Sequence, residues 1–244
     1  MTERTIPNPA RGGARLALPF WAALDAGNRA ALRASARSRP YAARAPLCVQ
    51  GDTSDHVVVI ERGWAKVTAT TADGHDVVLA VRGPGDLVCE SAVLGSRERS
   101  ATVTALGPLR GLLVPAERFT AFLDANPGLW RLVSGTMVGR LDDASRRLQA
   151  QASVKGPRRL AGLLAELAEL SLRHQAASGG AVGVPVDIAP PLSQQELGSW
   201  MDASRETVAR ALNELRRRGL VRTGWRRITV LDLDRLRAFA RDGH

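Results

Sequence analysis

The spacing of hydrophobic residues changes along the chain and separates it into parts of different structure. Residues 18–37 show helical spacing, whereas residues 39–114 contain short apolar runs separated by glycine or acidic turns, which is typical of a jelly roll or β-barrel. From residue 126 onward, apolar residues recur mainly every three or four positions, which predicts helices. The pattern therefore predicts an α+β fold, and the expected strands are residues 46–49, 57–60, 65–70, 77–81 and 109–114.

A long helix is expected to begin at Asn126-Pro127, because proline is well placed at the first position of a helix. Apolar residues then recur at spacings of four, four, three and four, as in a coiled-coil seam about three heptads long. This stripe could pack on the preceding domain of the same chain, but Gly156-Pro157 and a new domain follow it, which favours a dimerisation helix. We therefore predict a homodimer, and its interface residues are Val133, Met137, Leu141, Ala144 and Leu148.

Two short helices joined by a tight turn are predicted within residues 192–217. Ser193 and Glu196 have the spacing of a capping box, which marks a helix N-terminus. Ser204 can cap the second helix, and residues 220–230 read as a β-hairpin. The pattern is that of a helix-turn-helix followed by a β wing.

The second of these helices exposes charged residues in its first turns, namely Arg205, Glu206 and Arg210. Core packing does not explain them. In the major groove of DNA, an arginine can bind guanine O6 and N7, and a glutamate can accept from cytosine N4. The pattern therefore favours a DNA-reading helix, and the alternative is a solvated helix with ordinary surface charges.

Composition agrees with a polyanionic partner, since 34 Lys and Arg residues against 24 Asp and Glu give a formal net charge of +10. The arginine content also fits a GC-rich genome, so the charge alone decides nothing. No apolar run has the length of a membrane span, and the N-terminus lacks the apolar core of a signal peptide. We expect a cytoplasmic protein with no membrane partner.

The residues that usually carry catalysis or bind metals are sparse. Cys48 and Cys89 are the only cysteines, too few for a zinc or iron–sulfur ligand set, and no metal site is predicted. The four histidines lie in expected turns, near a helix end or at the C-terminus, without catalytic spacing, and we expect them in solvent. The sequence therefore does not predict an enzyme.

Residues 204–210, Ser-Arg-Glu-Thr-Val-Ala-Arg, resemble the recognition helix of the cyclic AMP receptor protein/FNR (Crp/Fnr) family. In that family the two arginines and the glutamate read a TGTGA-type half-site. The resemblance implies that Arg205, Glu206 and Arg210 read bases. It also implies contacts with the DNA backbone for Ser193, Gln194, Gln195, Ser204 and Thr207.

Residues 85–101 resemble the phosphate-binding cassette of the same family, in which a short helix and an arginine hold a cyclic phosphate and a glutamate holds the ribose. Here Cys89 replaces the usual glycine and Ala144 replaces a threonine that contacts the base, so weakened cyclic AMP binding is expected. Cyclic GMP and cyclic di-GMP are the other candidate effectors, and no cofactor is obligatory. The implied effector-binding residues are Cys89, Glu90, Ser91, Arg99, Ser100 and Ser145.

Four alternatives remain open at this point. Glu90 and Arg99 could form an internal ion pair in an empty pocket, giving a regulator without an effector. Cys89 permits a redox role, and His75 is the only nominal haem ligand in the β-rich part. The alternative from another class is an architectural DNA-binding protein driven by net charge.

The prediction for the whole chain is a dimeric, sequence-specific transcription regulator of the Crp/Fnr type. A cyclic-nucleotide-binding-type β-jelly-roll, the sensor domain (residues 18–125), follows a disordered N-terminus (1–17). A dimerisation helix (126–155) joins it to a winged helix-turn-helix domain (156–244). The expected partners are palindromic double-stranded DNA, a second copy of the chain and RNA polymerase.

Overall fold

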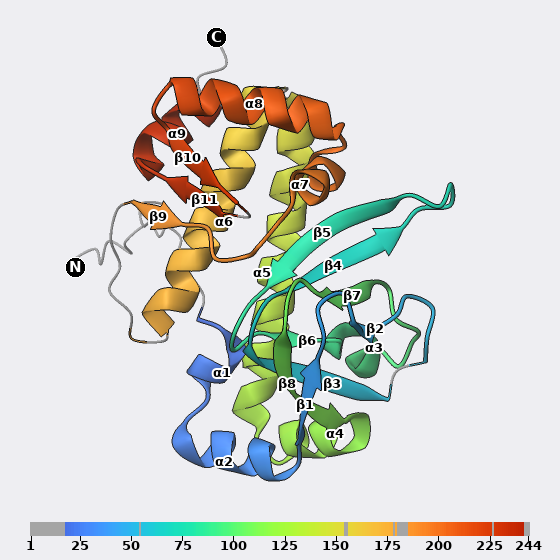
Figure 1. Cartoon of the computed structure of the whole chain (residues 1–244). Helices are drawn as coiled ribbons and strands as arrows, with labels where there is room; N and C mark the ends of the chain where they lie inside the picture. The colour runs from blue at the N-terminus through green and yellow to red at the C-terminus, as the bar shows by residue number, and fades with distance from the viewer. Residues whose placement is uncertain are drawn as a thin grey trace, which may run out of the picture.

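The computed structural model describes residues 18–53, 55–153, 156–177, 179, 185–225 and 227–241, without the side chains of residues 148 and 150–153. The segment 1–17, predicted to be disordered, lies outside these residues. Figure 1 shows a β-rich N-terminal domain and a helical C-terminal domain, with one long helix running along both. Within the part of the chain described, no helix is both long and apolar enough to cross a bilayer.

Two four-stranded antiparallel sheets form the sensor domain. The strands are β1 (Arg37–Tyr41), β2 (Pro46–Cys48), β3 (His56–Arg62), β4 (Ala65–Thr70), β5 (Asp76–Arg82), β6 (Leu87–Val88), β7 (Thr102–Ala105) and β8 (Leu109–Pro115). Their orders are β1-β8-β3-β6 and β2-β7-β4-β5. The predicted β-rich domain is confirmed, although β1, β6 and β7 were not predicted.

Helices cover one face of the first sheet. They are α1 (Phe20–Ala23), α2 (Ala26–Ala34), α3 (Glu90–Leu94) and α4 (Ala116–Asp124). The expected helical segment 18–37 is therefore two short helices, and it ends earlier because β1 begins at Arg37 and pairs with β8.

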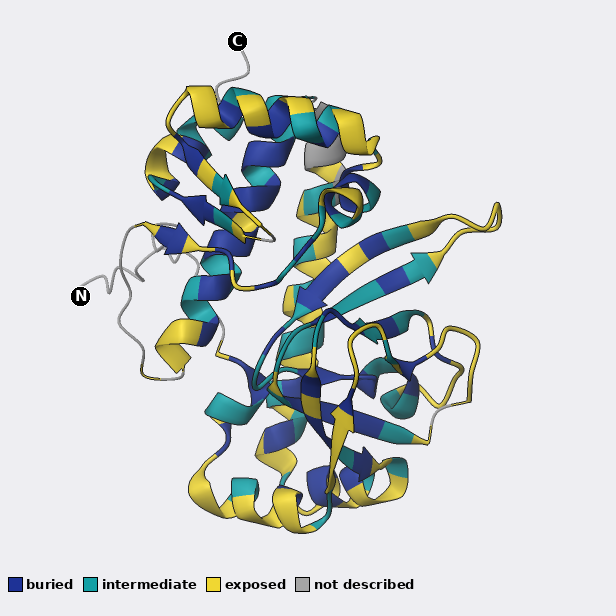
Figure 2. Cartoon of the chain, viewed as in Figure 1, coloured by how far each residue is buried: buried dark blue, intermediate teal, exposed yellow. Residues whose placement is uncertain are grey.

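Strand β3 shows why part of this sequence is a continuous apolar run. Val57 and Val59 belong to the core between the sheet and the helices, whereas Val58 and Ile60 belong to the core inside the roll. Successive side chains of a strand point to opposite faces, so a strand buried on both faces needs apolar residues at every position. Figure 2 shows this buried centre with exposed residues around it.

Helix α5 (Pro127–Ser153) follows α4 and has 27 residues, so it is about 40 Å long. Val133 is only 2% exposed and packs in the core of the sensor domain, and Met137 packs partly against the same core. The prediction of Val133 as an interface residue is therefore wrong, because its own domain already covers it. Further along, Val138 and Leu141 are 58% and 67% exposed, and Ala144 is also exposed. The side chain of Leu148 lies outside the described residues.

The C-terminal domain packs three helices and a small sheet on the helix that follows α5. The elements are α6 (Pro157–Ala177), β9 (Val186–Asp187), α7 (Gln194–Met201), α8 (Arg205–Arg217), β10 (Val221–Gly224), β11 (Arg227–Val230) and α9 (Leu233–Arg241). The predicted helix-turn-helix and wing are confirmed, and β9 extends the wing into a three-stranded sheet of order β10-β11-β9.

The two domains contact each other through apolar and polar side chains. Met201 of α7 shares an apolar cluster with Val78 and Val81 of β5. His174 of α6 is buried, with Nδ1 2.9 Å from the Pro84 carbonyl oxygen and Nε2 3.3 Å from an Asp86 carboxylate oxygen. The expectation that every histidine lies in solvent is therefore wrong for His174, because the sensor domain covers the end of α6.

Candidate effector cavity and nucleic-acid interface

The phosphate-binding cassette predicted from sequence, residues 85–101, contains β6 and α3 and ends where β7 begins. Cys89 caps α3 with a φ of 69°, in the left-handed region that glycine favours. This conformation agrees with a position at which glycine is usual. Glu90 and Arg99 are each 4% exposed, so both charged side chains are buried in the sensor domain.

A cavity of about 280 Å³ opens between the cassette, strands of the second sheet and α5. Five of the six predicted effector-binding residues line it: Cys89, Glu90, Ser91, Arg99 and Ser100. Ala144 of α5 also lines it, whereas Ser145 is exposed and lies outside the lining. The cavity of one chain therefore brings together the cassette residues but not Ser145.

Arg99 and Glu90 do not pair with each other in this structure. The Arg99 guanidinium donates to the backbone oxygens of Cys89 and, at 2.6 Å, His56. Glu90 instead forms an ion pair with Arg140 of α5, whose guanidinium also donates to the Leu87 carbonyl oxygen at 2.7 Å. The internal ion pair considered from sequence is thus not formed, and Glu90 connects the cassette to the long helix.

Sequence reasoning missed the other arginines of the cavity. Arg82, Arg140 and Arg147 line it together with Arg99, whereas its carboxylates are Glu90 and Asp143. Because cations outnumber carboxylates around a small cavity, the site favours an anionic ligand.

Arg82 is the least compensated of these charges. Its guanidinium donates to the Val81 carbonyl oxygen at 3.0 Å, and no described carboxylate lies within ion-pair distance of it. Burial, and secondly the neighbouring Arg140, lower the pKa of Arg82 to about 10. Its only sequence signal is an isolated arginine at the end of the apolar run 77–81, immediately before the cassette.

The cavity shows no arrangement typical of a resident metal. Across the residues that the structure describes, no group of three or more His, Cys, Asp or Glu side chains is placed to hold an ion. The cavity can bind anions and form hydrogen bonds, and two thiols, those of Cys48 and Cys89, are among its lining groups.

The helix-turn-helix is held by caps that the sequence specifies. Ser193 and Glu196 form a full capping box, in which Ser193 N donates to the Glu196 carboxylate at 2.8 Å. Ser204 caps α8 by accepting from Thr207 N at 3.2 Å. A Cβ at Gly198 would lie 2.5 Å from the Ala203 carbonyl oxygen, so only glycine allows this close turn between the helices.

Charged side chains on α8 fall into two groups. Towards its C-terminus they pair locally, since Glu214 accepts from Arg217 and Arg218. At its N-terminus, Arg205 and Glu206 are exposed and form no ion pair or hydrogen bond with any other described side chain. Arg210 is exposed too, with a single contact of 3.4 Å to the Thr207 hydroxyl. The residues predicted to read bases are therefore available to a partner.

The predicted contacts with the DNA backbone lie partly against the sensor domain. Gln194 and Gln195 are exposed, but a cleft between α7 and the β4–β5 hairpin is lined by Ser193, Gln195, Ser204 and Arg205. Across this cleft Lys66 Nζ lies 3.1 Å from a Glu196 carboxylate oxygen, and the Ser199 hydroxyl donates to the Asp76 carbonyl oxygen.

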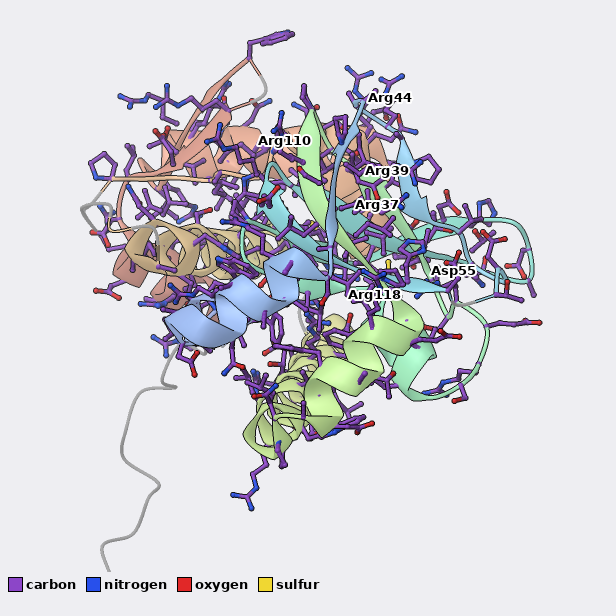
Figure 3. The ribbon with its side chains drawn as sticks, turned by 90° about the horizontal axis from the view of Figure 1, so that it is seen from below. Arg37, Arg39, Arg44, Asp55, Arg110 and Arg118 are labelled. Atoms are coloured by element: carbon purple, nitrogen blue, oxygen red, sulfur yellow. The ribbon has the colours of Figure 1, made fainter. Side chains whose placement is uncertain are left out.

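A second basic surface lies on the sensor domain. Figure 3 shows Arg37 and Arg39 of β1 near Arg110 of β8 and Arg44, all of them exposed. Part of the net positive charge is therefore separate from the recognition helix, and net charge alone does not mark the DNA-binding surface.

Comparison with protein families matches both domains. Residues 38–126 match the cyclic nucleotide-binding domain, and residues 158–239 match the Crp-like helix-turn-helix domain. A sensor domain of this kind joined to such a helix-turn-helix defines an effector-modulated, DNA-binding transcription regulator. The chain belongs to the Crp/Fnr family.

Curated relatives agree over most of the chain. The CRP-like cAMP-activated global transcriptional regulator of Mycobacterium tuberculosis is 26% identical over 192 residues, covering 79% of this chain and 83% of the relative. The cyclic AMP receptor protein of Thermus thermophilus is 28% identical over 189 residues, covering 76% of this chain and 80% of the relative. These relatives are transcription regulators and not enzymes.

Solved structures show the same fold. FixK2 from Bradyrhizobium japonicum superimposes with a TM-score of 0.71 at 20% identity, over 84% of this chain and 96% of that one. The c-di-GMP responsive global regulator CLP of Xanthomonas campestris gives a TM-score of 0.68 at 20% identity, over 85% of this chain and 100% of the CLP chain.

Proposed function

We propose that two copies of this protein bind a palindromic operator in double-stranded DNA, and that a cyclic nucleotide in the sensor cavity sets the affinity. Such a regulator acts in the cytoplasm, where its DNA lies, with RNA polymerase as a further partner and without enzymatic activity. The observation that carries the proposal is that Arg205 and Glu206, at the exposed start of α8, pair with no other side chain that the structure describes. The other end of α8 pairs its charges locally, whereas Arg205 and Glu206 leave their hydrogen-bonding groups open to base edges.

Base reading by α8 follows from where these groups stand. The N-terminus of a recognition helix lies deepest in the major groove, where arginine matches guanine and glutamate matches cytosine. We assign base reading to Arg205, Glu206 and Arg210, and backbone contacts to Ser193, Gln194, Gln195, Ser204 and Thr207. The wing and the exposed arginines of α8 add sequence-independent attraction to phosphates.

The test is selection of a binding site from random duplex DNA, followed by affinity measurements in excess competitor DNA. A specific dimer yields a palindrome whose half-sites are about 34 Å apart, and it keeps its preference in competitor. A charge-driven architectural protein yields no consensus and shows only a steep loss of affinity with salt. The second result would overturn the proposal.

The effector is the part that the cavity constrains through its size and charge. A volume of about 280 Å³ is just below the usual range for small-molecule sites, which favours a cyclic mononucleotide over cyclic di-GMP within one chain. Arg99 now donates to two backbone oxygens, so a phosphate that approaches it competes with them for the guanidinium. A phosphate that draws the guanidinium towards it therefore weakens the contact of Arg99 with the cassette at Cys89.

Calorimetric titration with cyclic AMP, cyclic GMP and cyclic di-GMP tests this assignment. We expect a cyclic mononucleotide to bind, and Arg99→Ala to weaken it by about tenfold or more, since a charge-assisted hydrogen bond contributes roughly 1.5 to 3 kcal/mol. A nucleotide that binds equally well to Arg99→Ala would place the effector elsewhere.

A further inference from the structure

The two cysteines of the chain meet in the wall of the effector cavity. Cys48 lies at the end of β2 and Cys89 at the N-terminus of α3, 41 positions apart in sequence, yet their sulfur atoms are 3.0 Å apart. Both are buried free thiols, and both line the cavity. A molecule that enters the cavity therefore meets a dithiol next to Arg99.

We propose that Cys48 and Cys89 form a thiol–disulfide couple that reacts with peroxides entering the sensor cavity. The pair needs only a small movement, because sulfur atoms in a disulfide are about 2.05 Å apart. A shared metal ion is a poorer match, since no third ligand from His, Cys, Asp or Glu accompanies the pair among the described residues.

The geometry assigns different roles to the two thiols. The Cys89 thiol donates a hydrogen bond to the Cys48 sulfur. This hydrogen bond, opposed by burial and assisted by the charge of Arg99, lowers the pKa of Cys48, whereas the same hydrogen bond and burial raise the pKa of Cys89. Because the thiolate is the reactive form, Cys48 is the attacking residue and Cys89 the resolving residue.

The chemistry balances with a peroxide as the oxidant. The Cys48 thiolate attacks one peroxide oxygen, so an S–O bond forms and the O–O bond breaks, and the leaving oxygen takes a proton to become water or an alcohol. Cys89 sulfur then attacks the sulfenic sulfur of Cys48, the S–S bond forms, and hydroxide leaves with the Cys89 proton as water. Two thiols are oxidised and one peroxide is reduced.

The disulfide acts on the residues that hold the proposed effector. The Cys89 carbonyl oxygen accepts from Arg99, and Glu90 is the next residue. A bond from Cys89 to β2 fixes this carbonyl and so holds the Arg99 guanidinium in its present position, which opposes its movement towards a phosphate. We therefore expect oxidised protein to bind a cyclic mononucleotide about tenfold more weakly, a consequence that rests on the proposed function while the couple itself does not.

The experiment measures the couple first, without any nucleotide. Reduced full-length protein is treated with hydrogen peroxide, acid-quenched, denatured, alkylated and weighed by mass spectrometry. We expect both thiols of one chain to escape alkylation together, with the loss of two hydrogen atoms and full recovery after dithiothreitol. Unreacted thiols, disulfides only between chains, or sulfinic and sulfonic acids as the sole products would overturn the proposal.

Single variants and calorimetry complete the test. Cys48→Ser should leave Cys89 alkylated after the same dose, because burial still raises the pKa of Cys89 once its hydrogen bond to Cys48 is gone. Cys89→Ser should stop at the sulfenic acid, trapped with dimedone. Equal nucleotide affinity of oxidised and reduced wild type would overturn the coupling. If neither form binds a nucleotide, the effector proposal fails. The mass measurement still shows whether Cys48 and Cys89 form the proposed disulfide.

Discussion

Arg82 illustrates how a single residue of the cavity opposes folding. Its partly buried guanidinium faces Arg140 and Arg147 and lacks an ion-pair partner among the described residues. A partly buried cation without an ion-pair partner lowers the free energy of unfolding, and it contributes to function only when an anion binds. Such a loss of stability is common at functional sites.

We therefore expect Arg82→Met to raise the free energy of unfolding by about 1 to 3 kcal/mol, because the neutral side chain needs no compensation. The sign follows from the pKa: folding lowers the pKa of Arg82 to about 10, so the protonated form destabilises the protein at neutral pH. Urea denaturation at pH 7 measures it. Arg110→Met, at an exposed position of β8, is the control and should change little. Lower stability of Arg82→Met would mean that an unrecognised group compensates the charge.

The residues proposed to read bases lie on α8, and substituting them tests the DNA interface. Arg205→Ala and Glu206→Ala should each weaken operator binding by roughly 1 to 3 kcal/mol and relax the preference at one base pair of each half-site. Thermal stability should barely change, since neither side chain pairs with another described side chain. Arg217→Ala, which removes a local ion pair with Glu214, should weaken binding to all DNA sequences equally. Normal operator binding by both reader variants would exclude α8 as the base-reading element.

Among the secondary-structure elements, the sequence was sufficient to predict features whose interacting residues lie close together along the chain. The capping box at Ser193 and the cap at Ser204 were predicted at the residue, because their partners lie three positions away. Strand β1 was missed because it is mostly exposed and polar, and β6 and β7 because they have only two and four residues. Such strands exist through pairing with distant strands, which no local pattern records.

Contacts between elements could not be predicted for the same reason. The ion pair of Glu90 with Arg140 joins residues 50 positions apart, and the contact of His174 with Pro84 joins residues 90 apart. Likewise, the apolar stripe in the sequence of α5 predicted that one face of the helix is apolar. It did not predict which residues of that face the sensor domain covers. Val133 is covered by the sensor domain and Leu141 is not.

Helix α5 supports a prediction about assembly. Val138 and Leu141, three positions apart on one face, are the exposed large apolar residues of this helix among those described. Leu141→Asp should convert the dimer to a monomer, because an unpaired charge in an apolar interface costs several kcal/mol. Sedimentation velocity measures this, and Leu18→Asp, at another exposed leucine, should leave the dimer intact. A Leu141→Asp protein that still sediments as a dimer would place the interface away from α5.

For the molecule as a whole, the contact between its domains decides which surfaces DNA can reach. The apolar cluster of the C-terminal domain continues into β5, and Ser193, Gln195 and Ser204 line the cleft beside the β4–β5 hairpin. With the DNA-backbone contacts proposed above, phosphates and the hairpin compete for this side of the helix-turn-helix. We therefore expect the arrangement described here to have the lower DNA affinity, and an effector to favour an arrangement in which the hairpin withdraws.

The ion pair between Lys66 and Glu196 is the charged contact across this cleft that a substitution can remove with least disturbance, since Glu196 keeps its capping box with Ser193. Both side chains are partly exposed, at 26% and 20%, so we expect Lys66→Met to destabilise the docked arrangement by only about 0.5 to 1 kcal/mol. Operator affinity without effector should then rise about two- to fivefold, while affinity at saturating effector stays unchanged. Fluorescence anisotropy with labelled operator measures both. Arg237→Met removes a comparable pair, with Glu169, inside the C-terminal domain and should alter neither value. If Lys66→Met leaves the effector-free affinity unchanged or lowers it, the hairpin does not restrain the helix-turn-helix.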